Sequence, residues 1–333
     1  MEGECYRSSV FYMVDRGEFM EQEMLQKEVI DEVFFARSTE WKEKAEEDGG
    51  CLVHYTSAQA AVQIIKSKKF WLRNHSFMND TSEVKHGIGL LEKALEKDGG
   101  GNLKKSLDQI RKDFSVLVMN KLKEYLNSPE VFIGCFCVPK SDWKESGKLS
   151  MWRGYGGNCG VAFFLNLSAF TLEKSPFNLV TSPVEYLDVE GFSQRLGEIS
   201  CSVDKNLKTL KGFPADRVAN AAFGSLFALA VSTKHKGFRE EEECRLLYFP
   251  KLFPSPVLEK MAEVEVIGAQ PQLVYKVPLS GELGGVPFND LFGSLLIGPT
   301  SNPNEIKSTF EFLLKEAGVE EPQVNLSNIP LRT

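Results

Sequence analysis

Apolar and polar positions alternate in short blocks along this chain, and the first clear blocks predict a strand, a helix and a second strand. Residues 51–55 form a mainly apolar run of strand length that contains one histidine. Ser57 is a typical N-cap residue, and the next segment, up to about Ser67, repeats apolar residues at helical intervals (Ala60, Ala61, Ile64 and Ile65). Residues 70–72 are again apolar and aromatic, which predicts the second strand.

Two helices are expected next. The segment 80–83 has the spacing of a helix start with a reciprocal Glu83 cap, and apolar residues follow at helical intervals (Val84, Ile88, Leu91 and Leu95). Three glycines at 99–101 are expected to end this helix. A further apolar stripe predicts one more helix, packed against the first as a hairpin (Leu103, Leu107, Ile110, Phe114 and Leu117).

The rest of the chain continues this mixture of strands and helices. Residues 131–138 are continuously apolar, as in a central strand, and a strand is also expected at 161–167. An apolar helix is expected at 218–231. A strand that includes residues 246–249 is expected to follow it. The tail predicts a strand, a helix and a strand at 295–297, 304–317 and 324–326. These elements predict a single α+β domain over residues 49–333.

Residues 1–48 are expected to form an N-terminal helical extension. The part from 18 to 47 is rich in Glu, Gln, Lys and Met, and it stops at Gly49 and Gly50. Apolar residues within it suggest one amphipathic helix (Met24, Val29, Val33 and Phe34). A packing arm is the simpler interpretation, and a helix that binds a regulatory or neutralising protein is the alternative.

Composition narrows the classes of function. A net charge of −7 and a pI of about 5.4 argue against a broad basic surface for nucleic acid. No apolar run approaches the roughly 20 residues of a membrane span, and the first residues lack a signal peptide pattern, so we expect a cytoplasmic protein that does not contact membranes. Seven cysteines without a Cys-x-x-Cys pair indicate reduced thiols and not a zinc site. Cys135 and Cys137 should share one face of a strand as core residues.

Three segments carry the candidate chemistry. His54, Tyr55 and Thr56 lie where a strand gives way to a helix, whose first N–H groups can bind an anion. Trp152, Arg153 and Tyr155 stand among three glycines, and Trp152 alone is better explained as a core plug. If the strand before 249 begins inside the acidic run 240–243, alternation places three charged residues on one face (Glu241, Glu243 and Arg245).

These elements resemble, in order, those of the bacterial "domain of unknown function 2971" family over roughly residues 50–332. The chain departs from the family at Cys244, where Trp is usual, and at Gly156, where a residue such as Ala is usual. The matching elements are Val53–Ser57, Phe77–Asp80 with Glu83, Gly134–Phe136, Met151–Trp152 with Tyr155, Gly160–Val161, Lys234 with Glu241, Glu243 and Arg245, Ile297–Pro299, and Ser327 with Arg332.

A second resemblance suggests the chemistry. His-x-Thr after a first strand, a Tyr before a later strand and a Glu at the start of another look like the His-Tyr-Glu arrangement of ADP-ribosyltransferases. That resemblance implies an α+β fold in which two short mixed sheets form a cleft for NAD, with flanking helices. It implies that His54 binds a ribose hydroxyl, Tyr155 stacks on nicotinamide and Glu243 stabilises the transition state.

The same resemblance implies roles for the neighbouring residues. Arg153 or Arg245 would bind the pyrophosphate, together with the helix start after Thr56, and Tyr55 and Trp152 would also border NAD. Glu241 would orient the nucleophile of an acceptor.

The activity implied is cleavage of NAD and transfer of ADP-ribose to a protein or nucleic acid, without a metal, as in a bacterial toxin or an anti-phage effector. Two alternatives remain at this stage. One is a metal-dependent nuclease or hydrolase in which four carboxylates and one amide would surround a divalent metal (Asn79, Asp80, Glu83, Glu241 and Glu243). The pair Asp80 and Glu83 is explained more simply as a helix cap. The other is a ligand-sensing module without chemistry.

Overall fold

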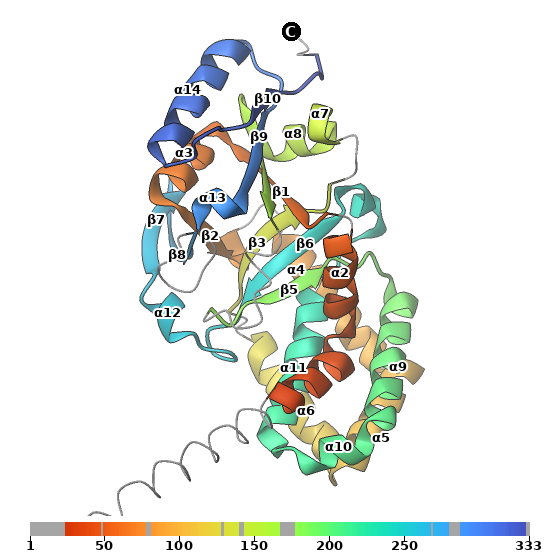
Figure 1. Cartoon of the computed structure of the whole chain (residues 1–333). Coiled ribbons are helices and arrows are strands. Elements are labelled where there is room, and N and C mark those ends of the chain that lie inside the picture. Colours follow the sequence, from red (N-terminus) through yellow and green to blue (C-terminus); the bar gives the residue numbers. More distant parts are fainter. Residues whose placement is uncertain are drawn as a thin grey trace, which may run out of the picture.

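The strands of this protein form an open mixed sheet, with a bundle of helices at one end of the molecule (Figure 1). The computed structural model describes residues 24–47, 49–77, 81–127, 130–139, 143–166, 177–267, 269–279 and 287–330. Within these residues the sheet has ten strands, and its main path runs β10–β9–β4–β1–β3–β2–β8–β7, with β6 attached to β3 and β5 to β6.

Seven of the described strands fall close to segments predicted from the sequence, and the strands at 180–183, 262–267 and 270–278 were not predicted. The described strands are β1 (Cys51–Ser57), β2 (Lys69–Asn74), β3 (Phe132–Cys137), β4 (Gly160–Asn166), β5 (Val180–Pro183), β6 (Glu243–Tyr248), β7 (Ala262–Ile267), β8 (Gln270–Pro278), β9 (Phe292–Ile297) and β10 (Val324–Leu326).

The helices divide between the two faces of the sheet. One face carries α3 (Ala58–Ser67) and α14 (Pro303–Glu316), with the short α12 (Pro256–Glu259) and α13 (Phe288–Leu291). The other face meets the bundle, which contains α4 (Thr81–Leu95), α5 (Asp98–Ile110), α6 (Phe114–Asn127), α9 (Val189–Lys205), α10 (Leu207–Gly212) and α11 (Ala215–Val231). A third, smaller apolar cluster lies under α7 (Trp143–Ser146) and α8 (Leu149–Tyr155). No helix in the described ranges is long and apolar enough to cross a membrane.

The predicted strand–helix–strand unit is confirmed as β1, α3 and β2. Ser57 caps α3 as expected, because its Oγ accepts a hydrogen bond from the Ala60 amide at 3.3 Å. The three buried apolar residues of α3 lie on one side of the helix, against the sheet (Ala61, Ile64 and Ile65).

Two helix boundaries differ from the sequence prediction. The glycines at 99–101 do not end a helix; α4 ends at Leu95, and Gly99 lies in the first turn of α5. A Cβ at Gly99 would lie 1.8 Å from the Ser193 carbonyl oxygen, so this glycine allows α5 to pack closely on α9. The single helix predicted through 103–117 is two helices, with Asp113 at a left-handed φ of 58° between them.

The N-terminal extension packs against both the helical bundle and the sheet where the structure describes it: residues 30–34 join the bundle core, and Ala45 joins the apolar cluster under α3 and α14. Its residues 24–34 and α2 (Ala36–Glu47) are separate helices with a bend at Phe35, not one helix. Val33 and Phe34 are buried in the bundle core, whereas Met24 is half exposed. The extension behaves as a packing arm in this region, and residues 1–23 lie outside the described part.

The sheet forks at β3, which has three partner strands. One edge of β3 pairs with β6 along its whole length. The other edge is shared, since β2 pairs with it at Phe132 and Ile133, and β1 pairs with it at Cys137. Residues 134–136 therefore face a gap between β1 and β2. Instead of the two short sheets expected from the sequence, the described strands form one sheet, and the fork is the place where β1 and β2 separate along the edge of β3.

Gly134 allows this arrangement, because it lies directly under an aromatic ring at the fork. A Cβ at this position would lie 2.3 Å from the Phe70 ring and 3.0 Å from the Leu72 side chain. Phe70 stacks on Phe136 at 4.7 Å between ring centroids, so aromatic packing over the glycine joins β2 to β3 beside the gap.

Candidate functional site

A cavity of about 350 Å³ lies at the fork and opens between β1 and β2. It is bordered by β1, β2, β3 and β6, by the start of α4 and by the end of α8. The structure brings most of the predicted site residues to this cavity (His54, Tyr55, Thr56, Tyr155, Glu241, Glu243 and Arg245).

His54 and Glu243 reach the cavity from opposite faces of the sheet. Val53 pairs with Cys137, and Cys137 pairs with Glu243, so these three side chains share one face. His54 alternates to the other face, which α3 covers, and its ring contacts Phe70 at 4.9 Å between centroids. The fork provides the opening through which both faces contribute to one cavity.

The imidazole of His54 is neutral at pH 7 and has a defined orientation. Its Nδ1 lies 2.9 Å from the Cys135 carbonyl oxygen, on the edge of β3 that faces the gap. A carbonyl can only accept, so Nδ1 carries the proton and Nε2 is an acceptor. Burial lowers the pKa of His54 to about 4, which the Cys135 carbonyl only partly opposes.

A buried cluster of charges borders the same cavity, with Lys234 at its centre. The Lys234 ammonium lies 2.6 Å from Glu243 Oε2, 2.7 Å from Glu241 Oε2 and 3.0 Å from Glu83 Oε1, and the side chain is 1% exposed. Arg245 joins the same carboxylates, donating from Nε to Glu243 at 2.7 Å and from Nη2 to Glu83 at 2.6 Å. Its Nη1 donates to the Val231 carbonyl.

The cluster keeps Glu243 ionised. Burial would raise the pKa of Glu243, but Arg245 and Lys234 more than offset this and lower it to about 2. Burial would likewise lower the pKa of Lys234, but Glu243, Glu241 and Glu83 raise it above its ordinary value. For Glu83 burial dominates over the two cations, and its pKa is raised.

The contacts of Glu83 differ from those predicted for the start of α4. We expected its carboxylate to fold back as a reciprocal cap; instead it is buried and bonded to Arg245 and Lys234. The first turn of α4 therefore ties the helical bundle to β6. Asn79, Asp80 and Arg332, which the sequence also singled out, lie outside the described residues.

Tyr155 and Tyr55 differ in how their hydroxyls are used. Tyr155 ends α8 and lines the cavity, and burial raises its pKa, so the phenol stays protonated. Tyr55 is buried, its hydroxyl accepts a hydrogen bond from the Lys148 amide at 3.0 Å, and its ring packs against Trp152. Of the two, Tyr155 is the better placed to contact a ligand.

Trp152 and Arg153 are not among the residues that border the cavity. Trp152 is buried under α8, and its indole Nε1 donates to the Ser146 carbonyl at 3.0 Å, which agrees with the core-plug interpretation. Arg153 is exposed on the same helix. These two residues were expected to contact a cofactor, and the structure places both outside the cavity.

Cys135 and Cys137 share a face of β3, as predicted, opposite Arg245 and Glu243. Burial raises the pKa of both thiols, so they remain protonated and unreactive. They contribute to the wall of the cavity as small apolar residues.

Lys234 occupies the position that a metal ion would take among these carboxylates. A divalent cation needs several oxygen ligands, and the three carboxylates nearest to each other here already surround an ammonium group. Within the described ranges no group of three or more His, Cys, Asp or Glu is arranged to hold a metal.

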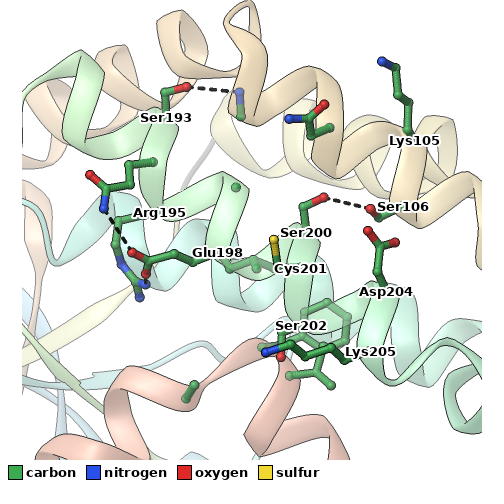
Figure 2. A pocket seen from close by; sticks show the side chains of 18 of the residues that line it. Lys105, Ser106, Ser193, Arg195, Glu198, Ser200, Cys201, Ser202, Asp204 and Lys205 are labelled. Carbon is green, nitrogen blue, oxygen red and sulfur yellow. Dashed lines mark hydrogen bonds and ion pairs between the residues drawn. The ribbon is translucent and has the colours of Figure 1, made fainter.

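A larger hollow, of about 940 Å³, lies between α5, α9 and residues 33–40 (Figure 2). Four of its charged side chains pair with one another (Arg37 with Glu40 and Glu198, and Arg195 with Glu198), and Ser106 bonds to Ser200 at 2.7 Å. It contains none of the predicted site residues, and its described lining has neither a buried charged side chain nor a buried polar atom without a hydrogen-bond partner. The cavity at the fork is therefore the better candidate, although it is smaller.

Comparison with known families supports the first resemblance. Residues 151–246 match the family described as "Protein of unknown function (DUF2971)". The match includes Tyr155 and the segment from Lys234 to Arg245, and it does not include His54. No curated protein and no solved structure matches the chain.

Proposed function

We propose that the cavity at the fork binds NAD and that the protein is an ADP-ribosyltransferase-like enzyme. In this proposal it cleaves the bond between nicotinamide and ribose and transfers ADP-ribose to a macromolecular acceptor. The observation that supports it most is the forked sheet, which gathers His54, Tyr155 and Glu243 at one cavity from β1, α8 and β6. The described strands form one open mixed sheet, so the support comes from the residues that meet at the fork and not from the fold as a whole.

Glu243 has the properties that the cleavage step requires. Loss of nicotinamide leaves positive charge on the ribose, and a fixed carboxylate stabilises that charge. Glu243 remains ionised because its pKa is about 2. Arg245 and Lys234 fix its orientation, and a carboxylate has about four acceptor sites, so room remains for a ribose hydroxyl.

His54 and Tyr155 are assigned the two ends of the dinucleotide. The neutral His54 ring has an acceptor at Nε2, which suits a hydroxyl of the adenosine ribose. Tyr155 is a protonated phenol whose ring can stack on nicotinamide. Glu241 is less buried than Glu243, and we assign it to orient the attacking group of the acceptor.

This activity suits a cytoplasmic toxin or anti-phage effector, because modification of a host macromolecule can stop growth. The metal-dependent hydrolase is less well supported, since Lys234 lies where the metal would bind. The ligand-sensing module uses the same cavity without cleavage, and the experiment below separates it from the enzyme.

The test uses the full chain with NAD labelled at two positions and a bacterial extract as the source of acceptors. We expect nicotinamide label in the small-molecule fraction and adenine label on protein or nucleic acid. Nicotinamide release without transfer would indicate a hydrolase that consumes NAD. Binding of NAD with neither release nor transfer would support the sensing module and contradict the enzyme.

A further inference from the structure

Three side chains that are cationic at pH 7 border the cavity, and they differ in how their charge is balanced (Lys234, Arg245 and Arg73). Lys234 contacts three carboxylates, and Arg245 contacts two. These two cations already have anionic partners. Arg245 therefore cannot also bind the diphosphate of a nucleotide without losing its ion pair with Glu243 or Glu83. Arg153 lies outside the cavity.

Arg73, near the end of β2, carries a charge that no carboxylate offsets among the described residues. Its Nε and Nη2 donate to Gln272 Oε1 at 3.2 and 3.1 Å, and Nη2 also donates to the Phe77 carbonyl at 2.8 Å. Both acceptors are neutral. Burial lowers the pKa of Arg73, but a guanidinium stays protonated in proteins. A half-buried positive charge with only neutral partners favours an anionic ligand.

Trp71 provides a second, independent sign of a ligand on the same face of β2. Its indole Nε1 is buried and has no hydrogen-bond partner in the part of the chain that the structure describes. A buried donor without a partner is unfavourable, so this position favours a ligand that supplies an acceptor. The ring is held from one side, because the Lys276 ammonium lies 4.9 Å from its centroid and is itself paired with Glu263 at 2.7 Å.

The spacing of Trp71 and Arg73 along β2 allows both side chains to contact one diphosphate group. They are two apart on one strand, so their backbones are roughly 7 Å apart and their side chains project to the same side. Both line the cavity, and β2 forms the prong of the fork that lies across from β1. An N–H donor and a guanidinium at this spacing can bind oxygens of two linked phosphates.

We propose that Trp71 and Arg73 form a subsite for the diphosphate of an adenine nucleotide. Arg73 binds the phosphate oxygens through its guanidinium, and the Trp71 indole donates to a neighbouring phosphate or ribose oxygen. The subsite replaces Arg153 and Arg245 in the role that the sequence resemblance gave them. It rests on the proposed function for the identity of the nucleotide, and its geometry is independent of any bond cleavage.

The test measures binding of ADP-ribose to the full chain by calorimetry at two salt concentrations. We expect Arg73→Gln to weaken binding on the order of tenfold to a hundredfold and to reduce its salt dependence. Arg73→Lys should be intermediate, because it keeps the charge and loses the planar fork. Trp71→Phe should weaken binding several-fold. Arg153→Gln, the matched control outside the cavity, should bind as the wild type does.

Several outcomes would overturn the subsite: no binding of ADP-ribose to the wild type, equal binding by Arg73→Gln, or equal losses for Arg73→Gln and Arg153→Gln. Inorganic pyrophosphate serves as the second probe, and binding as tight as that of ADP-ribose would show a simple anion site and contradict a nucleotide site. Thermal unfolding of each variant shows whether the fold is retained, and Arg73→Lys keeps the test decisive if Arg73→Gln is unstable.

Failure of the subsite and failure of the proposed function give different results. If ADP-ribose binding depends on Arg73 but NAD is not cleaved, the subsite stands and the enzymatic function falls. If NAD is cleaved and Arg73→Gln leaves the KM for NAD unchanged, the function stands and the subsite falls.

Discussion

At the scale of single residues, the Lys234 ammonium balances the negative charge of the carboxylates in the candidate site. Three buried or nearly buried carboxylates lie within 3.0 Å of its ammonium group, and Arg245 alone would leave them with excess negative charge. Removal of one partner from a buried ion cluster is costly because the remaining charges stay desolvated. Lys234 is thus a positioning residue for Glu243 and Glu241.

We expect Lys234→Met to lower the free energy of unfolding by about 3–5 kcal/mol, as measured by urea denaturation at pH 7. The matched control is Lys236→Met, whose ion pair with Asp188 lies on the surface, so its loss should leave the free energy of unfolding nearly unchanged. Equal losses in the two variants would contradict a structural role for the cluster.

His54 should make stability depend on pH in a defined window. Its folded pKa of about 4 lies below the ordinary value of 6.5, so the unfolded chain binds a proton first as the pH falls. The contribution of the neutral ring is complete above pH 6.5 and is lost between pH 6.5 and about 4, by up to roughly 3 kcal/mol. His54→Gln should therefore lose less stability over this range than the wild type.

The measurement is the free energy of unfolding at several pH values for both proteins. His235→Gln, at an exposed histidine, is the control for the loss of an imidazole elsewhere in the chain. If His54→Gln and the wild type lose stability in parallel between pH 6.5 and 4, the ring is not held in its neutral form.

At the scale of elements, local patterns predicted β1, α3 and β2 but could not predict the fork. The Ser57 cap and the apolar spacing of α3 are properties of neighbouring residues. The division of one β3 edge between β1 and β2 depends instead on strands distant in the sequence. Gly99 was misread for the same reason, because the contact that requires it is with Ser193 in another helix.

The fork gives a prediction for Gly134. A methyl group there would collide with the Phe70 ring, so Gly134→Ala should destabilise the protein by about 1–3 kcal/mol. Gly101→Ala in α5 meets nothing within 4 Å and should be neutral or stabilising by about 0.5–1 kcal/mol. Thermal and urea denaturation compare the two, and equal tolerance would mean that the aromatic packing at the fork is loose.

At the scale of the whole molecule, the charge cluster joins the helical bundle to the sheet. Glu83 comes from α4, Lys234 follows α11, and Glu243 and Arg245 belong to β6. Alternation predicted that Glu241, Glu243 and Arg245 share a strand face; the structure confirms this for Glu243 and Arg245, whereas β6 begins at Glu243 and Glu241 lies in the preceding 3-10 helix. The sequence could not show that Arg245 is paired with two carboxylates or that Arg73 has only neutral partners among the described residues, because contacts between distant segments decide both.

The most direct test of the central claim is the rate of nicotinamide release from NAD by the wild type, Glu243→Gln and Glu240→Gln. Glu240 is exposed and lies outside the cavity, so it controls for the loss of one acidic side chain. We expect release by the wild type and by Glu240→Gln at similar rates, and a rate lower on the order of a hundredfold for Glu243→Gln. Equal rates in all three proteins would remove Glu243 from the mechanism, and no release by the wild type would contradict the proposed activity.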